Sequence, residues 1–193
     1  MKKQCEGNPF CDALDPGTRA YLCENSTFIV QMPRQIQSTD LGNPRLEIIH
    51  KGVLFTFNLL EDGSQEFIHL IKKGDVLGTR HFFDRLAIPE YNLMTLTEVH
   101  KCSIPIKVAE KLYHENRDFA QALTENLLDM MNNLTRWVSM RSKNGTEKVQ
   151  QVYELLQDLD IDMTMITQDD LALIAGVSRI TVARAMKDIY KKN

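Results

Sequence analysis

The strongest constraint on the fold of this chain is a change in sequence character after Pro105. Between Lys107 and Arg141 there is no glycine or proline, and residues that favour helices dominate. Before this stretch, from about Thr27 to Ile106, short runs of β-branched and aromatic residues alternate with turn residues. The pattern predicts an α+β chain in which strands come first and helices follow.

The β-rich part contains four clear strand-like runs. They are Thr27–Val30, Leu46–Ile49, Val53–Phe57 and Glu66–Ile71, and turn signals such as Lys73-Gly74-Asp75 follow or separate them. Short strands at this spacing are typical of a small antiparallel barrel or sandwich. We therefore expect the first half of the chain to form one such domain.

Bulk composition limits the class of protein. The chain has 193 residues, of which 43% are hydrophobic and 25% charged, and its net charge is −3, as in ordinary globular proteins. Its apolar stretches are too short for a membrane span, and the start Met1–Pro9 lacks the apolar core of a secretory signal. We expect a cytoplasmic protein without membrane contact, whose four cysteines stay mostly reduced. No phosphate loop, hydrolase elbow or zinc-protease motif is found, so an enzyme is not expected.

The long helical stretch carries an apolar stripe. Leu123, Leu127, Met130, Leu134 and Trp137 follow one another in steps of 4, 3, 4 and 3, which is the repeat of a coiled-coil seam. Charged residues occupy the other faces, so the stripe is narrow. We expect it to form a homodimer seam, and the alternative is that it packs against the chain's own domain.

A hinge and three shorter helices are expected to follow. Ser142–Gly145 reads as the hinge, the next two helices lie near Thr146–Leu159 and Thr167–Ala175, and the last spans Ser178–Lys192. Only the last of these helices is rich in basic residues. Since the mildly acidic chain as a whole does not favour nucleic acid, such a local patch is what DNA binding would need.

The segment from Thr167 to Met186 fits a helix-turn-helix position by position. Ala172 is small where the two helices cross, and Gly176 suits a tight turn with positive φ. Arg179 and Arg184 on the second helix have the chemistry to contact guanine in the major groove. The expected DNA-reading residues are Ser178, Arg179, Ile180, Thr181, Arg184 and Lys187. A purely structural helical hairpin is the alternative.

With these features in place, the chain resembles the CRP/FNR family of transcription regulators. The anchors of the resemblance are Lys51-Gly52, the run 73–78, the run 102–105 and the run 176–184. The family has a β-roll sensor domain of the cyclic-nucleotide-binding jelly-roll type, a long dimerisation helix and a winged helix-turn-helix.

The resemblance also supplies domain boundaries and partners. It implies a β-roll sensor domain at 1–106, a dimerisation helix at 107–142 and a DNA-binding domain at 143–193. It further implies a homodimer that binds double-stranded DNA at a palindromic operator and contacts RNA polymerase if it activates.

Three departures from the family pattern change these expectations. Where cAMP-binding members carry Gly-Glu and a later Arg-Ser, this chain has Gly78-Thr79-Arg80 and the stretch Pro89–Leu93 without a basic residue, so cAMP is not expected. Ile180 stands where many members carry a Glu that contacts cytosine, so a different half-site is expected. The sequence ends at Asn193, near the end of the last helix, so the hairpin wing is expected to be missing.

The resemblance suggests an iron–sulfur cluster as one possible sensor. FNR-like members hold a [4Fe–4S] cluster through cysteines near the N-terminus and one before the long helix, and here Cys5, Cys11 and Cys102 match such positions. Cys23 is the candidate fourth ligand, with Asp12 or Asp15 as substitutes. Two alternatives remain: a thiol switch, for instance between Cys5 and Cys102, or cysteines that are plain core residues.

Other inputs stay open as well. His81 stands roughly where haem-based family members place an axial ligand, and Arg80 has the charge to pair with an anionic effector. Gly78, Arg80 and His81 are therefore the candidate effector pocket. An alternative function is an effector-binding module with weakened or lost DNA binding that responds to a small ligand, a haem-bound gas or thiol oxidation.

Overall fold

The computed structural model describes residues 7–38, 43–82, 91–159 and 161–192. Its N-terminal part contains α1 (Pro9–Asp12), α2 (Pro16–Glu24), β1 (Thr27–Gln31), β2 (Ile36–Ser38), β3 (Arg45–Lys51), β4 (Leu54–Leu59), β5 (Gln65–Ile71), β6 (Val76–Leu77), the short 3₁₀ helix η2 (Thr79–Phe82), β7 (Asn92–Thr95) and β8 (Val99–Pro105). The C-terminal part contains α3 (Ile106–Glu115), α4 (Arg117–Met140), α5 (Gly145–Asp158), the 3₁₀ helix η3 (Met163–Met165), α6 (Gln168–Ala175) and α7 (Arg179–Lys192).

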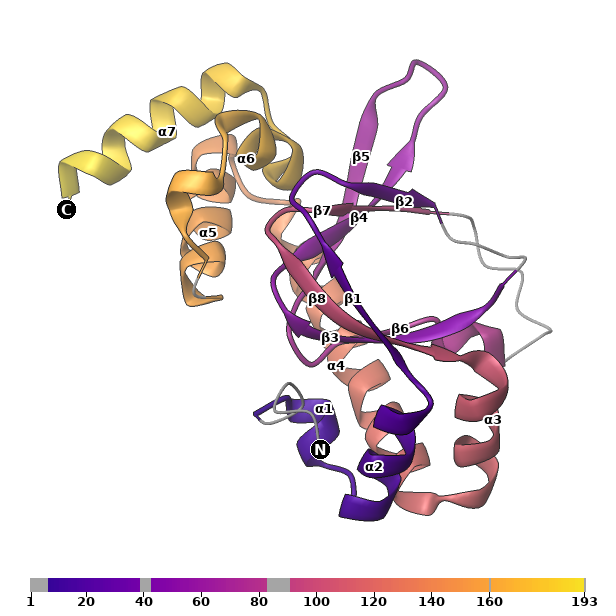
Figure 1. Ribbon diagram of the computed structural model, residues 1–193. Coiled ribbons are helices and arrows are strands. Elements are labelled where there is room, and N and C mark those ends of the chain that lie inside the picture. Colours follow the sequence, from indigo (N-terminus) through magenta and orange to yellow (C-terminus); the bar gives the residue numbers. More distant parts are fainter. Residues whose placement is uncertain (1–6, 39–42, 83–90, 160, 193) are drawn as a thin grey trace.

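The strands form two antiparallel sheets that enclose the interior of a β-roll. One sheet has the order β1-β8-β3-β6 and the other β2-β7-β4-β5 (Figure 1). Most neighbours in the sheets are distant in sequence, as when β1 pairs with β8 through Thr27 opposite Ser103, whereas β4 and β5 are consecutive strands. The expected α+β class with an antiparallel β domain is confirmed, and each of the four expected strand runs coincides with a strand.

One long helix was expected over residues 107–142, but the stretch after β8 forms two helices, α3 and α4. It is broken at Asn116, which has extended backbone angles and whose side-chain oxygen accepts a hydrogen bond from the Phe119 backbone N–H. Asparagine is a favoured helix cap, so α4 begins anew after it. α3 and α4 pack together beside the β-roll (Figure 1). Among the described helices, none is both long and apolar enough to cross a membrane.

Two residues of the expected seam of α4 are buried within the chain. Leu123 is 1% exposed and packs with Phe119 in a core beneath the roll, while Trp137 is buried in a second core with its ring 4.8 Å from that of Phe67. Leu127, Met130 and Leu134 lie between these two ends and are partly exposed. Burial within the chain therefore already covers the apolar surface of Leu123 and Trp137.

A second apolar stripe, shifted by one residue along α4, faces outward. Leu128, Met131 and Val138 are 54%, 62% and 64% exposed, and together with Thr135 they follow one another in steps of 3, 4 and 3. We call these four residues the outer stripe. Large apolar side chains aligned in this way are typical of an interaction surface.

The C-terminal helices are joined to the rest of the chain by a common core. Residues 141–144 connect α4 to α5, whose first turn is capped by the Asn144 side chain. The core that contains Phe67 and Trp137 continues into Leu171 and Ile174 of α6, so α6 is docked against the β-roll. Figure 1 shows α5, α6 and α7 grouped at the end of the molecule opposite α2 and α3.

Candidate nucleic-acid interface and ligand pocket

The pair formed by α6 and α7 is built around a tight turn at Gly176. Gly176 has φ +62°, a conformation that costs glycine little, and the following Val177 N–H donates to the Ala172 carbonyl at 3.0 Å. Leu171 of α6 and Val182 of α7 are both buried in the core. The tight turn expected at Gly176 is therefore present, and these two buried residues anchor the helices on either side of it.

At its start, α6 is held by a reciprocal capping box. The Thr167 hydroxyl accepts from the Asp170 N–H, and the Asp170 carboxylate accepts from the Thr167 N–H at 2.8 Å. This arrangement satisfies two backbone donors that would otherwise lack partners at the helix start. The Asp170 side chain thus takes part in the cap as well as the Thr167 side chain.

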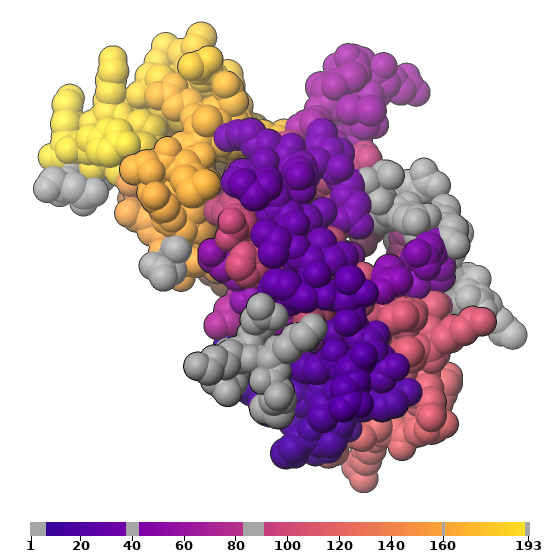
Figure 2. All heavy atoms as spheres, in the orientation of Figure 1, coloured from indigo at the N-terminus to yellow at the C-terminus, as the bar shows by residue number. Residues whose placement is uncertain are grey.

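The outward face of α7 carries the expected DNA-reading residues. Ser178, Arg179, Ile180, Arg184 and Lys187 are exposed, and Thr181 is half-buried with its hydroxyl 3.0 Å from that of Ser178. Arg179 lies 3.6 Å from Asp169 in an exposed ion pair, which is weak enough to exchange for another anion. Figure 2 shows α7 at one extremity of the molecule with its side chains projecting outward.

Tyr190 extends this face and was missed in the sequence. It is exposed, and it follows Lys187 by three residues, a spacing that places both on one side of the helix. The spacing was the available signal, but an aromatic residue near a chain end is more often part of a core. The face therefore combines three basic side chains with two large apolar ones, Ile180 and Tyr190.

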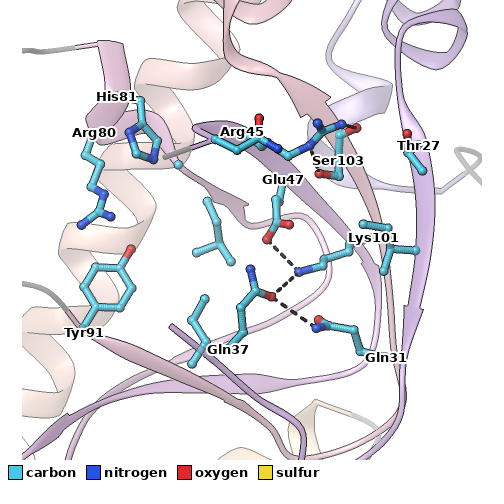
Figure 3. Close-up of a pocket in the computed structure, with 15 residues that line it drawn as sticks. Thr27, Gln31, Gln37, Arg45, Glu47, Arg80, His81, Tyr91, Lys101 and Ser103 are labelled. Atoms are coloured by element: carbon cyan, nitrogen blue, oxygen red, sulfur yellow. Dashed lines mark hydrogen bonds and ion pairs between the residues drawn. The ribbon is translucent and has the colours of Figure 1, made fainter. Parts of the chain in front are cut away.

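A second candidate site lies inside the β-roll. The cavity has a volume of about 420 Å³, within the range of small-molecule sites, and both sheets line it (Figure 3). Its wall includes the three expected effector residues Gly78, Arg80 and His81. The other lining residues are Thr27, Ile29, Gln31, Gln37, Asn43, Arg45, Glu47, Leu77, Tyr91, Leu93, Lys101 and Ser103.

A buried polar network forms the centre of this pocket. Lys101 is 3% exposed, and its ammonium donates to Glu47 Oε2 at 2.8 Å and to Gln37 Oε1 at 2.9 Å. Gln31 donates to the same Gln37 oxygen at 3.2 Å. Single polar residues within strands gave no sequence signal for this network, because only the roll brings β1, β2, β3 and β8 together.

One end of the pocket is formed by Arg80, His81 and Tyr91. The Arg80 guanidinium lies 5.5 Å from the centre of the Tyr91 ring, and its buried Nη2 has no hydrogen-bond partner among the described residues. Burial, and then the charge of Arg80, lower the pKa of His81 below its usual value, so that His81 is neutral near pH 7. Figure 3 shows Arg80 and His81 together on the side of the pocket away from Lys101.

The charges of the pocket do not cancel. Arg45, Arg80 and Lys101 are cationic, and Glu47 is the single acid among the residues that line the described cavity. Arg45 is held by Ser103, to whose hydroxyl it donates at 2.6 Å. Lys101 is paired with Glu47, which leaves the half-buried Arg45 and Arg80 as excess positive charge that favours an anionic occupant.

Comparisons with known proteins agree with this architecture. No family model and no curated protein matches the chain. Among solved structures, a putative transcriptional regulator of the CRP/FNR family from Eubacterium rectale matches with a TM-score of 0.72 and 12% identity, covering 95% of this chain and 87% of that one. The chain has the fold of the CRP/FNR regulators. The expected resemblance is confirmed at the level of structure.

Two further structures share the CRP/FNR fold with this chain. A cyclic nucleotide-binding domain containing protein from Listeria monocytogenes matches with a TM-score of 0.74 and 14% identity, covering 93% of this chain and 91% of that one. The c-di-GMP-responsive global regulator CLP from Xanthomonas campestris matches with 0.70 and 17%, covering 92% and 93%. At these identities the likeness concerns the fold.

The cysteines of this CRP/FNR fold do not form a cluster site in the described part of the chain. Cys11, Cys23 and Cys102 line one cavity together with His50, but its volume is about 10 Å³, close to that of one water molecule. Among the described residues, no group of three or more acidic, cysteine or histidine side chains is placed to hold a metal. Cys5 lies outside the described residues. The three described thiols by themselves therefore do not form an iron–sulfur site.

Proposed function

We propose that this chain is a sequence-specific DNA-binding transcription regulator that acts as a homodimer, with DNA affinity controlled by a small anionic ligand in the β-roll pocket. The observation that carries the proposal is the exposed face of α7, with Arg179, Arg184 and Lys187 on the second helix of the α6–α7 pair. An exposed basic helix of this kind fits the major groove of DNA.

The side chains of α7 suit both parts of DNA recognition. Arg179 and Arg184 have the planar fork that pairs with guanine O6 and N7, and Ile180 presents an apolar surface to a thymine methyl. Lys187 carries a point charge suited to a phosphate. A chain with a net charge of −3 relies on this local patch for its attraction to DNA.

The homodimer is assigned to the outer stripe of α4. Pairing of two stripes across a two-fold axis would bury Leu128, Met131 and Val138, which are the most exposed apolar residues of α4. The same axis would relate two α7 helices, so the operator is expected to be palindromic. A contact with RNA polymerase is expected only if the protein activates transcription.

The ligand class follows from the charge of the pocket. The excess of cations over Glu47 and the buried Arg80 Nη2 without a hydrogen-bond partner favour a small organic anion. Control by a small anion also agrees with the description of the Xanthomonas protein as c-di-GMP-responsive. Cyclic AMP remains an unexpected ligand, because the sequence lacks the family's residues for the cyclic phosphate. Of the stretch 89–93, residues 89 and 90 lie outside the described part of the chain.

A selection from random duplex DNA with the purified protein tests DNA recognition. Enriched sequences should be inverted repeats, and Arg179→Ala or Arg184→Ala should each weaken binding to them by about 5- to 150-fold, since a bidentate base contact is worth about 1–3 kcal/mol. Arg117→Ala removes an exposed cation from the start of α4 and serves as the charge-matched control. If no sequence is enriched, the alternative of a module without DNA binding replaces this proposal. If the double α7 variant binds the enriched sequences as tightly as the parent, the assignment of Arg179 and Arg184 as reading residues is refuted.

A further inference from the structure

An ion pair links the β-roll directly to the first helix of the α6–α7 pair. Arg34, on the turn between β1 and β2, donates through Nη1 to Asp170 Oδ1 at 2.9 Å and through Nη2 to Asp170 Oδ2 at 2.7 Å. These residues are 136 positions apart in sequence. A bidentate guanidinium–carboxylate pair fixes orientation as well as distance, so the turn holds the start of α6 in a defined position.

The Asp170 side of the pair is part of α6 itself. The same carboxylate accepts from the N–H and the hydroxyl of Thr167 at 2.8 and 2.6 Å, as part of the capping box. Burial alone would raise the pKa of Asp170, but the hydrogen bonds from Arg34 and Thr167 outweigh it and hold the pKa below its usual value. The carboxylate is therefore charged near neutral pH, and it connects Arg34 to the helix start.

The Arg34 side of the pair is part of a fixed turn. Arg34 has φ +66°, which is unusual for a residue with a side chain. Its N–H donates to the Thr95 carbonyl at 2.7 Å, the Gln35 N–H donates to the Thr95 hydroxyl, and that hydroxyl donates to the Met32 carbonyl. These bonds tie the turn to the end of β7, so movement of the flanking strands is passed to Arg34.

Both flanking strands reach into the ligand pocket. Gln31 ends β1, and Gln37 lies in β2 just after the turn. The Gln37 side-chain oxygen accepts hydrogen bonds from both Gln31 and Lys101 (Figure 3). An anion that attracts the Lys101 ammonium would compete with Gln37 for it. The short β1–β2 turn therefore carries Arg34 of the ion pair, and the strands on either side of it carry Gln31 and Gln37 of the pocket.

We propose that the β1–β2 turn couples the β-roll pocket to the DNA-binding helices, with the Arg34–Asp170 pair as the link that is made or broken. The proposal rests on the function assigned above to the pocket and to α7. The two partners differ in a way that suits a switch. The Arg34 side chain is 47% exposed, so water can solvate its charge when the pair breaks. Asp170 is 4% exposed, so its carboxylate would then be a buried charge without its ion-pair partner. Breaking the pair therefore loosens the start of α6 rather than the β-roll.

Hydrogen exchange measured by mass spectrometry on the whole chain, without DNA or ligand, tests the link. Arg34→Gln should speed exchange of the α6 amides by about tenfold, as expected for loss of a charge-assisted pair. Arg34→Lys, which keeps one charge but not the bidentate geometry, should give an intermediate rate. Lys51→Gln removes an exposed ion pair with Glu98 and should leave α6 unchanged.

A pocket variant tests the coupling itself. Gln37→Ala removes the acceptor of Lys101 and Gln31 without touching α6, and it should speed α6 exchange about threefold or more in the parent, a detectable coupling by double-mutant standards. In the Arg34→Gln background the same change should have no further effect on α6, because the link is already broken. The proposal would be overturned if Arg34→Gln left the exchange rates of the α6 amides unchanged. It would also be overturned if Gln37→Ala speeded α6 exchange by the same factor in the parent and in the Arg34→Gln background. These measurements need no DNA, so their failure is distinct from a failure of the parent protein to bind duplex DNA.

Discussion

The outer stripe of α4 makes a quantitative prediction about assembly. Leu128, Met131 and Val138 are 54%, 62% and 64% exposed in the single chain. Since complete burial of such a side chain contributes about 1.5–3 kcal/mol, burial of the exposed half of each contributes about 1 kcal/mol. Six such side chains meet across a two-fold interface, so the stripe is expected to contribute about 6 kcal/mol to dimer formation.

The double variant Leu128→Glu, Met131→Glu tests this magnitude. It removes four of the six apolar side chains from the dimer, about 4 kcal/mol, and weakens association about 1,000-fold before any cost of burying the new carboxylates. Analytical ultracentrifugation at micromolar concentration should show a monomer. Arg136→Glu adds a carboxylate on another exposed face of α4 and should stay dimeric.

A buried residue of α4 is expected to behave in the opposite way. Leu123→Ala should lower the free energy of unfolding by about 2–5 kcal/mol through the cavity it leaves, without a change in the subunit affinity of the folded protein. If the outer-stripe variant remained as dimeric as the parent while Leu123→Ala dissociated, the assignment of the two stripes would be refuted.

Two further predictions concern stability. Burial lowers the pKa of His69 to about 4. Below about pH 6.5 this imidazole takes up a proton in the unfolded chain but stays neutral in the folded chain, so the free energy of unfolding should fall by about 2 kcal/mol between pH 7 and pH 5. Chemical denaturation should show a smaller fall in His69→Gln. Gly176→Ala places a side chain at φ +62° with open space around it, so only the left-handed backbone should lower the stability, by about 1–2 kcal/mol in thermal unfolding. Gly176→Asn should lower the stability by less. Equal stability of all three proteins would contradict the role of Gly176 in the turn.

The sequence was informative wherever one residue type determines local structure. Gly176 predicted the turn between the last two helices, and the change after Pro105 predicted the order of strands and helices. The break at Asn116 was not predicted, because an asparagine in a run of helix formers becomes a cap only when the chain must turn. The short strands β2, β6 and β7 were also missed, since two to four residues carry too little alternation to detect.

The stripe on α4 shows a different limit. Leu127 and Leu128 are neighbours, and Met130 and Met131 are neighbours, so two heptad patterns one residue apart fit the same helix. Periodicity gives the direction of an apolar arc but not which part of it faces the chain's own core. Likewise, the Lys101–Glu47 pair and the Arg34–Asp170 pair depend on contacts between distant segments, which no local pattern encodes.

Hydroxyl-radical footprinting of the purified protein on a DNA sequence obtained by selection tests the central claim most directly. A dimer that presents two α7 helices should protect two short segments of backbone whose centres lie about 10 base pairs apart, or a multiple of that distance. Arg179→Ala should weaken both protected segments together. A single protected segment, or none at protein concentrations that saturate the selected DNA, would contradict a dimeric DNA-binding regulator.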